Sequence, residues 1–154
     1  MSGWNISEPR LHRRLIDTLY VDAMVLADEA RSYFDQGGKA ERDALDPLTR
    51  VSFSCESLKV TTRLMHVIAW LLTQRAVEAG EMAPHEALDP SRRLGPAPVS
   101  ETDAVETMPA AARGLIEAST ELYRRVALLD QAQLANDTAD SPARSMLARL
   151  AKSF

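Results

Sequence analysis

The residues of this chain that could do chemistry are few and far apart. Its three histidines are His12, His66 and His85, and its one cysteine is Cys55. None of the spacings that bind phosphate, dinucleotide or zinc occurs, since the chain has no G-x-x-x-x-G-K, G-x-G-x-x-G, C-x-x-C or H-E-x-x-H. The Glu-x-x-His pairs of di-iron bundles are missing as well. We therefore predict a protein that is not an enzyme and that holds no metal or cofactor.

Three individual side chains have both a structural and a chemical interpretation. Asp22 lies at the edge of an apolar stripe, where a carboxylate usually pairs with a basic residue of a neighbouring helix, and Lys59 and Arg63 are the candidates. Cys55 is interpreted as a small core residue and His66 as a rim histidine. A pocket that brought Asp22, Cys55 and His66 together would instead indicate a ligand-binding or metal-dependent protein.

Length and composition indicate one soluble domain rich in helix. The chain has 154 residues, of which 45% are hydrophobic and 26% charged, and its formal net charge is −4. This acidic balance argues against a nucleic-acid binder, because neutralising phosphates requires a basic face. A lone cysteine fits a reducing compartment, and the N-terminus has no apolar signal segment. The most apolar window, Val60 to Leu72, is too short to cross a bilayer, so we predict a cytoplasmic protein without membrane contact.

A long predicted helix from Asp46 to Gly80 organises the chain. Asp46 is placed to cap the first turn, Pro47 suits the first helical position, and Gly80 is placed to end the helix in the left-handed conformation. Two apolar stripes and one polar strip repeat along it at intervals of three and four residues. The first stripe comprises Leu48, Val51, Cys55, Leu58, Thr62, Met65, Ala69, Leu72 and Ala76. The second comprises Phe53, Ser57, Val60, Leu64, Val67 and Leu71. The polar strip, predicted to face water, comprises Glu56, Lys59, Arg63, His66, Trp70 and Thr73.

Two apolar stripes on one helix require two sets of neighbours. We predict that one stripe closes the core with the chain's other helices and that the other packs against a second copy of the chain. The predicted dimer interface comprises Val60, Leu64, Val67 and Leu71, with Ile68 and Trp70 at its margins.

Two further amphipathic helices complete the predicted fold, an all-α three-helix bundle with a long second helix and short flexible termini. The first helix runs from an N-cap at Ser7, after a loose segment, to about Gln36. The third runs from about Thr107 to Asn136, which makes residues 1–136 the bundle domain. The link before the third helix is a predicted crossover that lets it run parallel to the second helix or dock at the far end. The prolines that break this link are Pro84, Pro90, Pro96 and Pro98.

Residues 137–154 are predicted to form a flexible amphipathic tail. Its charged residues are basic from Arg144 onward, and its apolar residues share one face. A tail of this kind docks on its own bundle, binds a partner groove or an anionic surface, or stays disordered. The residues predicted to contact a partner are Arg144, Met146, Leu147, Leu150 and Phe154.

Residues 56–82 resemble a known family. The stretch ESLKVTTRLMHVIAWLLTQRAVEAGEM is similar to the central helix of the alphaproteobacterial family that contains the regulator of CtrA degradation, RcdA, a domain of unknown function. The helix lengths, the proline-broken link and the basic, apolar ending agree with that family. The resemblance implies a dimeric three-helix bundle without enzymatic activity. It also implies an adaptor that joins the ClpXP protease to cell-cycle regulators of the response-regulator type, and tethering of this kind strengthens weak binding.

Two other functions remain open at the level of sequence. A helix-turn-helix DNA-binding regulator would read bases with a basic helix, and the strip of Lys59, Arg63 and His66 is the nearest match. A small-ligand-binding helical protein would need a concave site with converging polar groups.

Overall fold

All regular structure in the described part of the chain is helical. The computed structural model describes residues 3–139 and 142–153. Its α-helices are α1 (Gly3–Ser32), α2 (Lys39–Asp43), α3 (Pro47–Glu78), α4 (Thr102–Glu106), α5 (Ala110–Ala139) and α6 (Pro142–Ser153). A π-helical turn spans Tyr33–Gly37, and two 3-10 turns span Glu86–Leu88 and Pro90–Arg92. The predicted all-α fold class is confirmed, and no helix within these two ranges is long and apolar enough to cross a bilayer.

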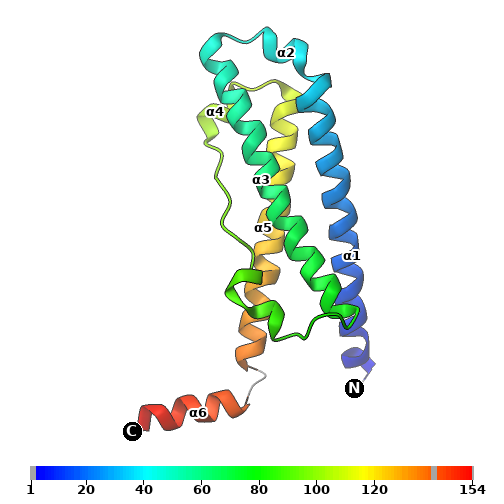
Figure 1. Cartoon of the computed structure of the whole chain (residues 1–154), viewed down its shortest axis with the longest axis vertical. Coiled ribbons are helices and arrows are strands. Elements are labelled where there is room, and N and C mark those ends of the chain that lie inside the picture. The colour runs from blue at the N-terminus through cyan, green and yellow to red at the C-terminus, as the bar shows by residue number, and fades with distance from the viewer. Residues whose placement is uncertain (1–2, 140–141, 154) are drawn as a thin grey trace.

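The three longest helices, α1, α3 and α5, lie side by side along the long axis of the molecule (Figure 1), and we call them the core helices. α1 and α3 run antiparallel. Arg75 near the end of α3 lies 4.3 Å from the ring centre of Tyr20 in α1, while the rings of Phe34 and Phe53, at the opposite end, are 5.3 Å apart. Apolar side chains of all three helices form one core. Its most deeply buried members include Ile16, Leu19, Val60, Val67, Leu71, Ala112, Ile116 and Val126.

The ends of α3 follow the local signals in its sequence. The side chain of Asp46 accepts a hydrogen bond from the backbone N–H of Thr49 at 3.3 Å, and Pro47 occupies the first turn. Gly80 has a φ of 77°, and its N–H donates to the carbonyl of Val77 at 3.1 Å. The predicted cap and stop of this helix are therefore confirmed.

The start of α1 differs from the prediction. The helix begins at Gly3, so Ser7 lies inside it and is not its N-cap. Pro9 also lies inside the helix, where it removes one backbone hydrogen bond without ending the helix. The predicted loose segment is wrong from residue 3 onward, and residues 1 and 2 are outside the described part.

The end of α1 widens into the π-helical turn before the chain reverses. The N–H of Gly38 donates to the carbonyl of Tyr33 at 2.6 Å, a bond that spans five residues instead of four. A Cβ atom at position 38 would lie 2.8 Å from the ring of Tyr33 and 2.9 Å from its carbonyl oxygen. Glycine is required here because the tyrosine backbone cannot move aside.

α5 runs parallel to α3, because the link between them returns along the core helices before α5 begins (Figure 1). Hydrogen bonds from Arg63 to Ser119 and from Trp70 to Asp130 show this direction, since the residue numbers rise together in both helices. The returning segment, residues 93–100, has no regular secondary structure from residue 94 onward and is drawn out along the core helices (Figure 1), and we call it the strap. The link is thus a crossover to a parallel helix, the first of the two predicted arrangements.

Candidate functional site

The polar strip of α3 is covered by the strap and α5 instead of facing water. Glu56, Arg63 and Trp70 are each 2% exposed, and Thr73 is 9% exposed. The prediction of a solvent-facing strip is therefore wrong for these four residues. Polar groups survive at this depth only when they are hydrogen-bonded. The strap and α5 supply partners to Glu56, Arg63 and Trp70, and Thr73 donates to the carbonyl of Ala69 within α3.

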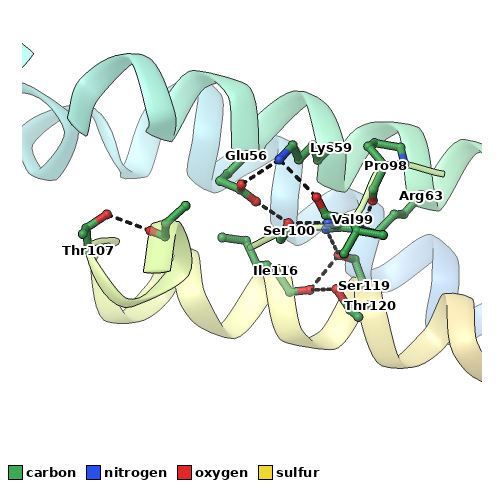
Figure 2. Close-up of polar contacts among 11 residues, drawn as sticks. Glu56, Lys59, Arg63, Pro98, Val99, Ser100, Thr107, Ile116, Ser119 and Thr120 are labelled. Carbon is green, nitrogen blue, oxygen red and sulfur yellow. Dashed lines mark hydrogen bonds and ion pairs between the residues drawn. The ribbon is translucent and has the colours of Figure 1, made fainter. Parts of the chain in front are cut away.

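Arg63 is the centre of this buried network (Figure 2). Its Nε donates to the carbonyl of Pro98 at 3.2 Å, its Nη1 donates to Ser119 Oγ at 3.2 Å, and its Nη2 donates to Ser100 Oγ. Burial lowers the pKa of the guanidinium, and the charge of Glu56 partly opposes that change. One side chain of α3 thereby holds both the strap and α5.

Glu56 is the buried carboxylate of the same network. It accepts a hydrogen bond from the hydroxyl of Ser100 and forms an ion pair with Lys59 Nζ at 3.3 Å (Figure 2). Lys59 also donates to the carbonyl of Val99 at 3.2 Å. A buried charge is tolerated when a counter-charge and further hydrogen bonds surround it, and Glu56 has both.

A second network fixes the start of the strap. Arg93 donates to both carboxylate oxygens of Asp130, at 2.8 and 2.7 Å, and Trp70 Nε1 donates to Asp130 Oδ1 at 2.9 Å. Burial acts to raise the pKa of Asp130, but the hydrogen bonds from Arg93 and Trp70 outweigh it and leave that pKa below its usual value. The same pairing raises the pKa of Arg93.

Between the two networks, the strap backbone lies directly on the imidazole of His66. A Cβ atom at Gly95 would lie 2.6 Å from His66 Cε1 and Nδ1, so only glycine permits this approach. The carbonyl of Gly95 accepts a hydrogen bond from Tyr123 Oη at 2.6 Å. His66 also lines a cavity of about 730 Å³ between α3 and the link, together with Trp70 and Arg92.

The first apolar stripe of α3, not the second, faces away from the core helices. Its large members are exposed: Leu48 by 78%, Leu58 by 68% and Met65 by 65%. Cys55 is exposed as well. We call this first stripe, from Leu48 to Ala76, the outer stripe.

The second stripe, which carries the predicted dimer interface, is instead the contribution of α3 to the chain's own core. The buried members are Val60, Leu64, Val67 and Leu71, together with Trp70 at the margin, and Ile68 is half-buried. Side chains enclosed by α1 and α5 have no surface to offer a second copy. The assignment of inner and outer faces was therefore reversed in the sequence prediction, because both stripes repeat with the same period.

Comparison with known proteins places the chain in a family. The family model described as a protein of unknown function, DUF1465, matches residues 7–154. The chain belongs to the DUF1465 family. It is similar to the crystal structure of RcdA from Caulobacter crescentus CB15, with 33% sequence identity and a TM-score of 0.64, over 77% of this chain and 91% of that chain. No curated protein matches the chain significantly. The predicted resemblance to the RcdA family is confirmed, and the chain is an RcdA-like member of DUF1465.

In this DUF1465 chain, the remaining candidates for chemistry do not converge. Asp22 is exposed and pairs with neither Lys59 nor Arg63, which are taken by Glu56 and the strap, so the predicted ion pair is wrong. Cys55 is on the outer stripe and not in the core, which corrects its interpretation as a core residue. Among the residues that the structure describes, no three His, Cys, Asp or Glu side chains gather to hold a metal ion.

The strip proposed for base reading is also unavailable in this fold. Arg63 is enclosed beneath the strap, and Lys59 points its ammonium group at Glu56 and Val99. A recognition helix needs its basic side chains free to reach a DNA groove. The structure therefore removes the feature on which the DNA-binding alternative depended.

The C-terminal segment forms helix α6, which stands apart from the core helices (Figure 1). Two of the predicted partner-contact residues, Met146 and Leu150, are exposed by 62% and 51%. The side chains of Arg144 and Leu147, and all of Phe154, are outside the described part. The exposed apolar residues of α6 and the outer stripe of α3 are two surfaces suited to protein contacts.

Proposed function

We propose that this DUF1465 protein is a non-enzymatic, dimeric adaptor of the cytoplasm that links the ClpXP protease to cell-cycle regulatory substrates through protein contacts. The proposal is supported by the similarity to RcdA and, within the molecule, by the outer stripe. An adaptor requires surfaces instead of reacting groups, because it acts by raising the local concentration of a substrate at its protease. In this view residues 1–136 form one bundle domain, although α5 continues to Ala139, and the segment that follows, with α6, carries a separate partner contact.

The exposure of the outer stripe is the observation that supports the proposed dimer. A series of exposed apolar residues at alternating intervals of three and four is the pattern of a helix packed against another helix. Soluble monomers rarely expose a continuous apolar row of this length, and such rows mark interaction sites. Leu48, Leu58 and Met65 are all more than 60% exposed in the single chain, so a second copy is the simplest partner that buries them.

The stripe is also symmetric about its own midpoint, Thr62. Cys55 and Ala69 each lie seven residues from Thr62, and Leu48 and Ala76 each lie fourteen residues from it. Two antiparallel copies of α3 would therefore place Leu48 against the small Ala76 of the other copy. This is the self-complementary arrangement that a two-fold interface requires.

Sedimentation equilibrium tests the dimer. At micromolar concentration the chain should sediment as a dimer, and Leu58→Glu should sediment as a monomer with unchanged helix content in circular dichroism. Leu128→Glu is the matched control, because Leu128 is a leucine of α5 with a similar exposure, 57%, away from the stripe. A monomeric wild-type chain, or equal loss of the dimer in both variants, would rule out this interface.

Oxidative cross-linking tests the direction of pairing. In the antiparallel arrangement Ala69→Cys places its thiol opposite Cys55 of the other copy, so mild oxidation should join the variant into covalent dimers and leave the wild-type chain monomeric on a denaturing gel. In a parallel arrangement, Cys55 would meet Cys55 and the wild-type chain would cross-link.

Capture of ClpX tests the adaptor role. The full chain, immobilised, should retain ClpX and a response-regulator substrate from a native cytoplasmic extract, whereas a chain that ends at Asn136 should retain neither if the tail makes the contact. Retention of neither protein by the full chain would contradict the adaptor proposal. This outcome is independent of the dimer, which sedimentation measures with the purified chain alone.

A further inference from the structure

We propose that the groove between α3 and α5 is a peptide-binding site that the strap fills in the single chain. The occupant that displaces the strap is an extended segment of a partner protein with the pattern Pro-x-Pro-x-Ser. This inference goes beyond the adaptor role and needs neither ClpX nor a dimer.

The strap contacts the groove as a separate extended peptide would. From residue 95 to residue 100 it offers backbone carbonyls to side-chain donors of α3 and α5, and the side-chain hydroxyl of Ser100 joins Arg63 and Glu56. Leu94 at its start packs against the core, but the one large apolar side chain after it, Val99, is 80% exposed. The three carbonyl contacts are Tyr123 to Gly95, Arg63 to Pro98 and Lys59 to Val99.

The groove keeps its internal partners when the strap leaves. Arg63 would still donate to Ser119 of α5, and Glu56 would still pair with Lys59 one turn away (Figure 2). A buried charge without any partner would make departure of the strap prohibitive. Because each of these two charges retains one, the donors remain in place to receive another segment.

The strap is also anchored separately at its two ends. Arg93 holds its start through the paired hydrogen bonds to Asp130. After α4, Met108 is 4% exposed in the core. Leu94 and Val105 also pack against the core, so the segment that can lift while the core helices stay packed is residues 95–100.

The chain itself identifies the chemistry of the occupant. The groove donors are placed for carbonyls at positions 95, 98 and 99 and for a hydroxyl at position 100, and prolines occupy positions 96 and 98. Proline restricts φ, so a Pro-x-Pro segment is already extended and loses little conformational entropy on binding. The donors that bind the extended segment in this groove are the side chains of Lys59, Arg63 and Tyr123.

A labelled peptide tests the site directly. The probe is a fluorescein-labelled copy of residues 93–101, and its receptor is the full chain with residues 95–100 replaced by Gly-Ser repeats of equal length. Fluorescence anisotropy should show binding to this receptor at least about tenfold tighter than to the wild-type chain, whose groove is filled. A probe with Ser100→Ala should bind the receptor about tenfold more weakly, because it lacks the hydroxyl that joins Arg63 and Glu56. A scrambled peptide of the same composition is the control.

Hydrogen exchange on the wild-type chain keeps the proposal falsifiable if the receptor fails to fold. The Nε–H of Arg63, which donates to the strap carbonyl of Pro98, should be protected from exchange at least about a hundredfold less than the backbone N–H groups of α3 and α5, because the strap opens without global unfolding. Equal exchange rates, or no preference of the folded receptor for the probe over the scrambled peptide, would overturn the proposal. Either result leaves the adaptor proposal intact, because no protease or substrate takes part in the measurement.

Discussion

Replacement of Arg63 by methionine tests whether the polar residues of α3 form a buried network or a solvated strip. Arg63→Met keeps most of the side-chain volume but removes hydrogen bonds to α5 and to the strap. It also removes a nearby positive charge from Glu56, which is 2% exposed. Removing one member of a buried charged network costs about 3 to 5 kcal/mol. We expect the lower end, about 3 kcal/mol, because Glu56 keeps its pairing with Lys59.

Urea unfolding followed by circular dichroism measures this loss. With a slope of about 2 kcal/mol per molar urea, the midpoint should fall by about 1.5 M, at one fixed protein concentration because association adds to stability. The double variant Glu56→Gln with Arg63→Met should recover part of the loss, since no carboxylate is then left buried. Arg124→Met is the control, because that arginine pairs with Glu121 at the surface. A midpoint shift no larger for Arg63→Met than for Arg124→Met would refute the buried network.

Three further substitutions test individual contacts. Gly38→Ala should destabilise the chain by about 2 kcal/mol in thermal unfolding, because the added Cβ meets the ring and the backbone of Tyr33, which cannot both move. Gly37→Ala is the control and should show no such change, because its added Cβ would meet nothing closer than 3.7 Å. Gly95→Ala should cost about 1 kcal/mol in the same assay and speed hydrogen exchange in the strap, since the imidazole beneath it must rotate away. Asp130→Asn should lower the melting temperature near neutral pH. Folding lowers the pKa of Asp130, so the stability that its carboxylate contributes is fully present above the unfolded value of 3.8 and is lost as the pH falls below it. The difference in melting temperature between the wild-type chain and Asp130→Asn should therefore shrink at acidic pH. A difference that does not change with pH would contradict the pairing with Arg93.

The local signals in the sequence were sufficient for both ends of α3 but not for its faces. Asp46 and Gly80 fix the ends of α3 through atoms only a few residues away, which is why a linear pattern predicts them. The two apolar stripes of α3 have the same period and similar composition. Nothing within the helix shows which stripe packs against α1 and α5. The sequence prediction therefore placed the dimer interface on residues such as Val60 and Leu64, which are buried in the core of the single chain.

The strap network was missed for a different reason. Glu56 and Arg63 have the residue types of a solvated strip, and the partners that allow their burial are mainly backbone carbonyls and serine hydroxyls from distant segments. Carbonyls leave no signature in a sequence, because every residue has one. The one available sign was the run Gly95-Pro96-Ala97-Pro98, whose extended backbone is suited to lying along a helix.

The parallel course of α5 also sets the order in which the chain folds. α1 and α3 are separated only by residues 33–46, so their contacts close a short loop. Trp70 and Asp130 are 60 residues apart in sequence, and a contact at that separation forms more slowly. Glu56 and Arg63 therefore stay hydrated until α5 and the strap dock. We expect their dehydration to accompany that docking, so the rate of docking should depend on salt.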